Sequence, residues 1–248
     1  MNEIMRRRRA MMAAQGGSAH GTWEDLFRTI DAGTYATEYA VGEVFPLDLG
    51  STIGVVNARI VAFDADVISN TQNDKAPITL VAEFLSNNKK RMNPALSGTT
   101  GAYVVGTGTI GGWKECELRS YVASTVYDAF PSDVKTRILS VSKMSKSYDQ
   151  TGAVVNNEQT DDNVWLLSQK EIRGTGDEVG VAYSAWFNSN DRRKVIPADA
   201  GVTSTVYYLR SANSTKNADG VLTSTGALGS AGSTVTGTYS YLIGFCVG

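Results

Sequence analysis

The 248-residue sequence contains one histidine, two cysteines and five prolines, and these scarcities exclude several kinds of chemistry. The histidine, His20, lies in a Gly- and Ser-containing stretch near the N-terminus, so no Ser-His or Cys-His catalytic pair is indicated. Zinc sites need clusters of Cys and His, and no such cluster is present. Cys116 and Cys246 are compatible with one disulfide or with two buried thiols, and the thiols are favoured.

Charge and long apolar runs are also scarce. The formal net charge is −2 and only 19% of residues are charged, which gives no reason to expect a nucleic-acid partner. Residues 10–14, which follow the basic run at residues 6–9, are too few for a signal-peptide core, and no later segment predicts membrane insertion. We therefore expect synthesis in a cytoplasm without a signal peptide, and release by a route such as lysis.

The first third of the chain is predicted to contain an arm and a small helix-and-hairpin region. Residues 1–20 form a basic N-terminal arm, which is either a solvated terminus or a segment that packs against a larger assembly. In the region 21–75, Thr22 three residues before Asp25 predicts a capped helix that ends at Gly33. The β-type runs at residues 41–47 and 52–63, separated by a turn, predict a hairpin.

Residues 76–248 are predicted to form the main domain. An apolar run covers residues 77–85, one helix covers 115–129, and Pro131 opens another that carries Val134, Ile138 and Leu139. A polar loop is expected at residues 145–163 and a buried strand at 164–167, followed by short strands from residue 179 onward. Helices in the middle of the chain, with strands before and after them, favour an α+β fold.

Two short motifs match ligand-binding patterns, but the residues around them do not support a ligand site. Residues 106–111 match GxGxxG, but no second parallel strand with an acidic end follows, so a plain glycine-rich loop is favoured over a dinucleotide site. Asp161, Asp162 and Asn163 could supply oxygens to calcium, although a polar loop that caps the next strand is favoured. No acid pair stands out for catalysis, so we expect no cofactor, no metal and no enzymatic activity.

A set of short phrases follows in order along the chain: APIT at 76–79, MNP at 92–94, GGW at 111–113 followed by LR at 118–119, VWLLS at 164–168 with Glu171, YYLRS at 207–211 and GFCV at 244–247. Over roughly residues 35–248, this ordered set resembles an uncharacterised domain family that is common in phages and prophages of gut Firmicutes and in bacterial surface proteins. That family is related to the formylglycine-generating-enzyme-like branch of C-type-lectin folds.

The resemblance implies a C-type-lectin-like domain with short antiparallel strands and two or three helices. It implies a core that includes Trp113, Trp165, Leu167 and Phe245. Arg119 and Arg210 are implied to be fold-stabilising buried arginines more often than ligand contacts. Tyr207-Tyr208 replaces the family's usual Trp-Trp. The cysteine motif of the oxidising enzymes and the calcium-dependent sugar motifs of true lectins are absent, so the implied fold comes without either site.

The C-terminal segment, residues 204–248, has an unusual composition. Its only charged residues are Arg210, Lys216 and Asp219, and it is rich in Ser, Thr, Gly, Ala, Asn and Tyr. This alphabet resembles the variable segment of C-type-lectin-fold proteins diversified by retroelements, although Lys216 departs from it. Tyrosine among small polar residues is typical of adaptable binding surfaces. The predicted ligand contacts are Tyr207, Tyr208, Asn213, Asn217, Asp219, Tyr239 and Tyr241.

Together these features predict a protein of a phage particle, a tail-fibre or head-fibre type of adhesin, whose C-terminal surface contacts a glycan or protein of a host or mucosal surface. Its N-terminal region is expected to contact other virion proteins, and a homo-oligomer is expected, with a trimer favoured. The alternative is a capsid-decoration or tail-connector protein of the same fold. An enzyme that acts on a surface polymer would need an acid pair that the sequence does not reveal.

Overall fold

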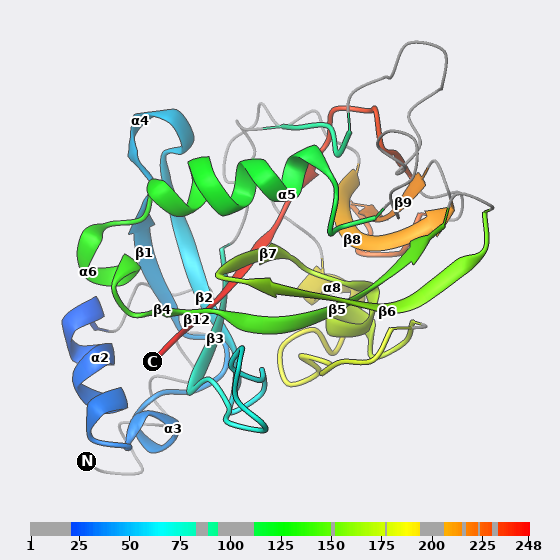
Figure 1. Cartoon of the computed structure of the whole chain (residues 1–248). Helices are drawn as coiled ribbons and strands as arrows, with labels where there is room; N and C mark the ends of the chain where they lie inside the picture. Colours follow the sequence, from blue (N-terminus) through cyan, green and yellow to red (C-terminus); the bar gives the residue numbers. More distant parts are fainter. Residues whose placement is uncertain are drawn as a thin grey trace.

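The structure is a computed structural model, and it describes residues 21–82, 89–93, 112–149, 152–176, 178–193, 206–214, 217–222, 224–229 and 233–248. Within these ranges the fold is α+β, with short helices and three sheets whose strands are mostly antiparallel (Figure 1). The predicted fold class is confirmed at this level. Residues 1–20 and the GxGxxG match at 106–111 lie outside the described ranges.

The largest sheet is antiparallel, and its central strand comes from the end of the chain. All five residues of this last strand are buried, so both faces of the sheet are covered along it. The sheet has the order β1-β2-β3-β12-β4, with β7 also pairing with β12, and its strands are β1 (Val44–Asp48), β2 (Val55–Phe63), β3 (Ile78–Ala82), β12 (Ile243–Val247), β4 (Ile138–Leu139) and β7 (Val164–Leu166).

The predicted hairpin of the first third is confirmed as β1 and β2, with the short helix α4 (Gly50–Ile53) in the connection. The apolar run after residue 77 forms β3, and the predicted buried strand at 164–167 forms β7. Because β2 pairs with β3, the region 21–75 and the region 76–248 share one sheet and one hydrophobic core.

The first helix in the described ranges, α2 (Trp23–Asp31), has the predicted capping box. Asp25 N–H donates to Thr22 Oγ1, the Asp25 carboxylate accepts from Thr22 N–H, and Gly33 after the helix has a φ of 68°. The short helix α3 (Tyr35–Glu38) follows. These local hydrogen bonds explain why the beginning and end of this helix follow from the sequence.

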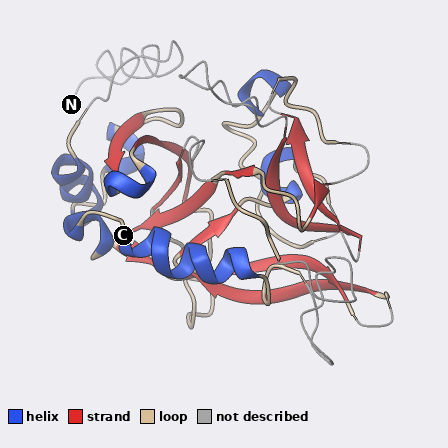
Figure 2. Ribbon diagram, turned by 90° about the horizontal axis from the view of Figure 1, so that it is seen from above, coloured by secondary structure: helices blue, strands red, loops and turns tan. Residues whose placement is uncertain are grey.

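The predicted second helix is confirmed as α5 (Glu117–Tyr121), which continues into a π-helical turn, η1 (Val122–Val126). This helix buries Leu118, Val122 and Val126, and Figure 2 shows it running alongside the strands. The helix opened by Pro131 is only α6 (Ser132–Lys135). Ile138 and Leu139 were expected on it but form β4, because β12 offers them backbone partners. No helix in the described ranges has both the length and the apolar character required to cross a membrane.

The prediction of a polar loop at residues 145–163 is wrong. The segment forms most of a hairpin of β5 (Val141–Tyr148) and β6 (Val154–Asp162). Burial alternates strictly along β5, but its inward positions include Lys143, Ser145 and Ser147. The hydrophobic alternation that identifies a strand is absent, because polar residues occupy the inward positions. Partners elsewhere in the fold satisfy Lys143 and Ser145.

The C-terminal half also forms a small four-stranded sheet, as the short β-type runs predicted. Its order is β10-β9-β8-β11, and β11 runs parallel to β8. Figure 1 shows the far end of the β5–β6 hairpin beside β8 and β9. The remaining elements of this half are α7 (Gln169–Arg173), α8 (Asn190–Arg193), β8 (Val206–Ser214), β9 (Asn217–Leu222), β10 (Ser233–Thr234) and β11 (Ser240–Tyr241).

The predicted core residues are all buried: Trp113, Trp165, Leu167 and Phe245. Cys116 and Cys246 are both free and buried, which confirms the two buried thiols. Burial raises the pKa of the Cys116 thiol to about 12, so this thiol stays protonated at neutral pH.

Candidate functional site

Four of the seven predicted contact residues, three of the tyrosines and Asp219, are buried in the structure. Tyr207, Tyr208 and Tyr241 have no exposed surface. The Tyr207 hydroxyl donates to the Arg193 carbonyl oxygen at 3.1 Å, and the Tyr208 hydroxyl donates to the Gly237 carbonyl oxygen at 2.7 Å. A ligand does not reach these three rings in this conformation, and they support the sheet instead. The sequence missed this because β8 is buried on both faces over most of its length.

Asn213, Asn217 and Asp219 lie together at the end of the β8–β9 hairpin. Asn213 is exposed, Asn217 is half-buried, and Asp219 is 8% exposed. The Asn213 Nδ2 donates to Asp219 Oδ1 at 3.0 Å, and this hydrogen bond crosses the hairpin. The short side chains therefore present polar groups on a paired, ordered stretch of backbone.

Tyr239 lies in a different part of this sheet. Its ring packs edge-on against Tyr208 with a centroid distance of 5.1 Å, and its backbone pairs with Lys90. Tyr208 is five residues from Asn213 along β8, which corresponds to roughly 16 Å. The structure therefore brings together three of the predicted contacts and leaves the half-buried Tyr239 apart from them.

Sequence reasoning missed Tyr148, at the end of β5. Its hydroxyl donates to the Asn213 carbonyl oxygen at 2.9 Å, and it pairs across the hairpin with Val154, which is 48% exposed. The period-2 spacing of Lys143, Ser145 and Ser147 was the available signal, but those residues are polar. We call Tyr148, Val154, Asn213, Asn217 and Asp219 the distal surface.

Arg210, three residues before Asn213, fastens β8 to the protein interior. Its guanidinium donates to both oxygens of Glu171, with Nη1 to Oε2 at 2.5 Å and Nη2 to Oε1 at 3.1 Å. It also donates to the carbonyl oxygens of Leu166 and Met144 and to Ser145 Oγ. The expected fold-stabilising arginine is confirmed here, because a bidentate pair fixes orientation as well as distance.

Lys143 lies beside the same carboxylate, on β5. Its Nζ donates to Asp66 Oδ1 at 2.5 Å, to Glu171 Oε1 at 3.0 Å and to the Tyr183 hydroxyl at 2.9 Å. It also lies 3.6 Å from the ring centroid of Trp165. Burial by itself lowers the pKa of Lys143, but the charges of Asp66 and Glu171 outweigh burial and raise it above its usual value. The lysine is therefore held as a cation between two carboxylates.

The pKa of Glu171 makes this network sensitive to acid. Burial raises that pKa, but Arg210 and Lys143 outweigh burial and bring it from 4.5 to about 2. Below about pH 4.5 the Glu171 carboxylate takes up a proton in the unfolded chain, but in the folded protein it stays ionised until the pH approaches 2. The stabilisation is therefore complete above about pH 4.5 and is lost as the pH falls towards 2.

We expect the free energy of unfolding to fall by about 2 kcal/mol through this group alone between about pH 5 and about pH 3. Urea unfolding at a series of pH values, on the wild type and on Glu171→Gln, measures the effect. The wild type should lose stability more steeply than the variant below about pH 4.5. Parallel curves for the two proteins would contradict the assignment to Glu171.

A second buried group surrounds Asp162. Its carboxylate accepts from Trp113 Nε1 at 2.9 Å, from Thr160 Oγ1 at 2.6 Å and from Arg119 Nε at 2.8 Å. Arg119 is about a quarter exposed and also contributes to this structural contact. Asp161 accepts from Ser142 instead, and the described ranges contain no group of three or more metal-binding side chains.

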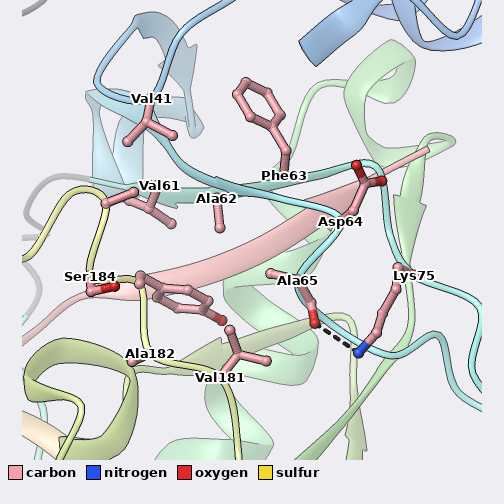
Figure 3. Close-up of a pocket in the computed structure, with 12 residues that line it drawn as sticks. Val41, Val61, Ala62, Phe63, Asp64, Ala65, Lys75, Val181, Ala182 and Ser184 are labelled. Atoms are coloured by element: carbon pink, nitrogen blue, oxygen red, sulfur yellow. Dashed lines mark hydrogen bonds between the residues drawn. The ribbon is translucent and has the colours of Figure 1, made fainter.

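A cavity of about 480 Å³ lies between the end of β2 and the segment that contains Tyr183 (Figure 3). It is lined largely by apolar side chains, with Asp64 and Lys75 at one end. Both have partners, because Asp64 accepts from the Tyr35 hydroxyl at 2.6 Å and Lys75 Nζ donates to the Ala65 carbonyl oxygen at 3.1 Å. None of the predicted contact residues lines this cavity.

One family model, described as a domain of unknown function (DUF6273), matches residues 105–239, more than half of the chain. The matched stretch includes Lys143, Glu171, Arg210 and the whole distal surface. No curated protein and no solved structure matches.

Proposed function

The chain belongs to the DUF6273 family of domains of unknown function, and we propose that it is a non-enzymatic ligand-binding protein of a phage particle. The distal surface is the proposed contact area, and a C-type-lectin-like domain is the proposed fold. The ordered phrases of the sequence and the antiparallel α+β architecture support the fold. The neutral, Tyr- and Asn-containing C-terminal segment supports the placement on a particle.

One observation carries the proposal: the exposed, neutral side chain of Asn213 lies on a hairpin that is anchored in the protein interior by Arg210. Arg210 is 2% exposed and paired with Glu171, whereas Asn213, three residues further along β8, is exposed. A preformed surface loses less conformational freedom on binding than a mobile one. Tyr148 and Val154 add apolar area beside the amides, a mixture that suits protein or glycan surfaces.

The proposed ligand is a glycan or protein on a host or mucosal surface. The proposed route of attachment is the N-terminal region, which would contact other virion proteins, and a homo-oligomer, with a trimer favoured, would display several distal surfaces. When several distal surfaces on one particle bind at the same time, the overall affinity exceeds the affinity of each single contact.

Binding of the purified protein to a panel of bacterial cell-surface polysaccharides, mucin glycans and intact bacterial cells tests the proposal. The Asn213→Ala/Asn217→Ala and Tyr148→Ala variants should bind at least about tenfold more weakly, a difference of roughly 1.4 kcal/mol. Asn57→Ala, an exposed asparagine on β2, is the matched control and should bind as the wild type does.

Equal binding by the wild type and the distal-surface variants would overturn the proposal, as would the absence of binding to every surface in the panel. A particle map that shows residues 206–222 occluded between subunits would instead select a capsid-decoration or tail-connector role.

A further inference from the structure

A lysine and an aspartate meet in a closed site away from the distal surface. Lys143 Nζ lies 2.5 Å from Asp66 Oδ1, and the two side chains are 3% and 6% exposed. The ring of Trp165 covers the ammonium group. An amine and a carboxyl group held at contact distance, away from water, are the two reactants of an amide bond.

The other oxygen of Asp66 is held by hydrogen-bond donors. Oδ2 accepts from Thr79 Oγ1 at 2.6 Å and from the Tyr183 hydroxyl at 3.0 Å, and the Cys246 thiol lies 3.6 Å away. One carboxylate oxygen thus faces the amine while the other faces donors. Donors in that position stabilise the negative charge that develops on a carbonyl oxygen under nucleophilic attack.

A proton acceptor is also in place. Glu171 Oε1 lies 3.0 Å from Lys143 Nζ, and Arg210 fixes the orientation of this carboxylate. The Tyr183 hydroxyl lies within hydrogen-bond distance of Lys143, Asp66 and Glu171. The four groups form a continuous path along which protons pass from the nitrogen to the carboxyl oxygen.

We propose that Lys143 and Asp66 condense into an intramolecular amide, assisted by Glu171. The resting site is charged, and the reactive form is the minor state in which one ammonium proton has passed to Glu171. In that state the neutral amine nitrogen attacks Cγ of Asp66. The Nζ–Cγ bond forms and the Cγ–Oδ1 bond breaks. Oδ1 leaves as water with two of the three ammonium protons, one of them returned by Glu171, and the third stays on the amide nitrogen. No oxidant or reductant is consumed.

The charge balance of the site favours this product. Two buried charges, each costly to remove from water, are replaced by a neutral amide. Glu171 and Arg210 remain as a balanced pair, so the condensation leaves neither of them without a counter-charge. Water excluded from the site does not return to hydrolyse the bond. The cross-link would tie the connection between β2 and β3 to β5, independently of any ligand.

Intact-mass measurement of the purified full-length protein tests the proposal. The wild type should weigh about 18 Da less than its sequence mass, the mass of one water. Trypsin should then yield the peptide 60–75, which contains Asp66, joined to the peptide 138–146, which contains Lys143. Lys146→Arg, a half-buried neighbour on β5, is the control and should keep the mass loss.

Glu171→Gln should retain the full sequence mass. Because that change also disturbs Arg210, Tyr183→Phe is the second variant: it keeps the ring, removes the hydroxyl, and should leave a larger uncondensed fraction. A folded wild type that keeps its full mass after prolonged incubation overturns the proposal. A water loss confined to peptide 60–75, without the joined peptide, also overturns it, because that pattern marks a cyclised aspartate.

Discussion

Replacing Arg210 with methionine is expected to lower the free energy of unfolding by about 3–5 kcal/mol, because the change leaves Glu171 buried without its closest cation. Glu171 is 3% exposed and accepts two hydrogen bonds from Arg210. The carbonyl oxygens of Leu166 and Met144 lose a donor at the same time. Urea unfolding followed by tryptophan fluorescence measures the loss.

Two further variants separate the charge effect from lost packing. Arg28→Met, in the exposed ion pair with Asp25, is the matched control and should leave the unfolding midpoint unchanged. Arg210→Met/Glu171→Leu should recover part of the stability lost in the single variant, because it removes the orphaned carboxylate while Lys143 keeps Asp66. A double variant no more stable than Arg210→Met would mean that the charge of Glu171 is not the cause.

Replacing Phe245 with alanine is expected to lower the free energy of unfolding by about 3–5 kcal/mol, because it leaves a cavity in the centre of the main sheet. Phe245 has no exposed surface and lies in register with Leu80 on one side and Val164 on the other. Its ring packs edge-on against Phe130 with a centroid distance of 5.0 Å. The β12 backbone, paired on both sides, has little freedom to close the cavity.

Thermal unfolding should show a drop of roughly 10 °C in Tm for this variant, given the entropy of unfolding of a chain of this size. Val55→Ala, on the same sheet but 69% exposed, is the matched control and should change Tm by less than about 2 °C. A Phe245→Ala protein within about 1 kcal/mol of the wild type would show that the core collapses onto the vacated space.

The sequence could not predict which of the contact candidates are exposed. A tyrosine in a strand with a mixed pattern is compatible with either face, and the composition of residues 204–248 cannot say which rings point outward. Tyr207 and Tyr208 are buried on β8, which packs against β5 and α7, and Tyr241 is buried on the neighbouring strand β11. The short amides at residues 213 and 217 remain accessible because they lie at the end of the hairpin.

The buried contacts of Lys143 with Asp66 and Glu171 could not be predicted from the sequence either. Lys143 is 77 residues from Asp66 in the chain and 28 from Glu171, and these spacings carry no periodic signal. The alternation along β5 is regular in burial but not in hydrophobicity. The sequence therefore predicts a polar loop here and does not reveal the hairpin that carries Tyr148 to the distal surface.

The sequence alone determined the features that depend on a few neighbouring residues. These are the capping box at Thr22 and Asp25, the apolar strand β3, the helix that contains α5 and the α+β class. Only the tertiary structure decided that Lys143 lies in the core and that Tyr148 lies beside Asn213. The physical reason is that caps and apolar patterns are satisfied locally, whereas a polar side chain is buried only when distant segments bring its partners.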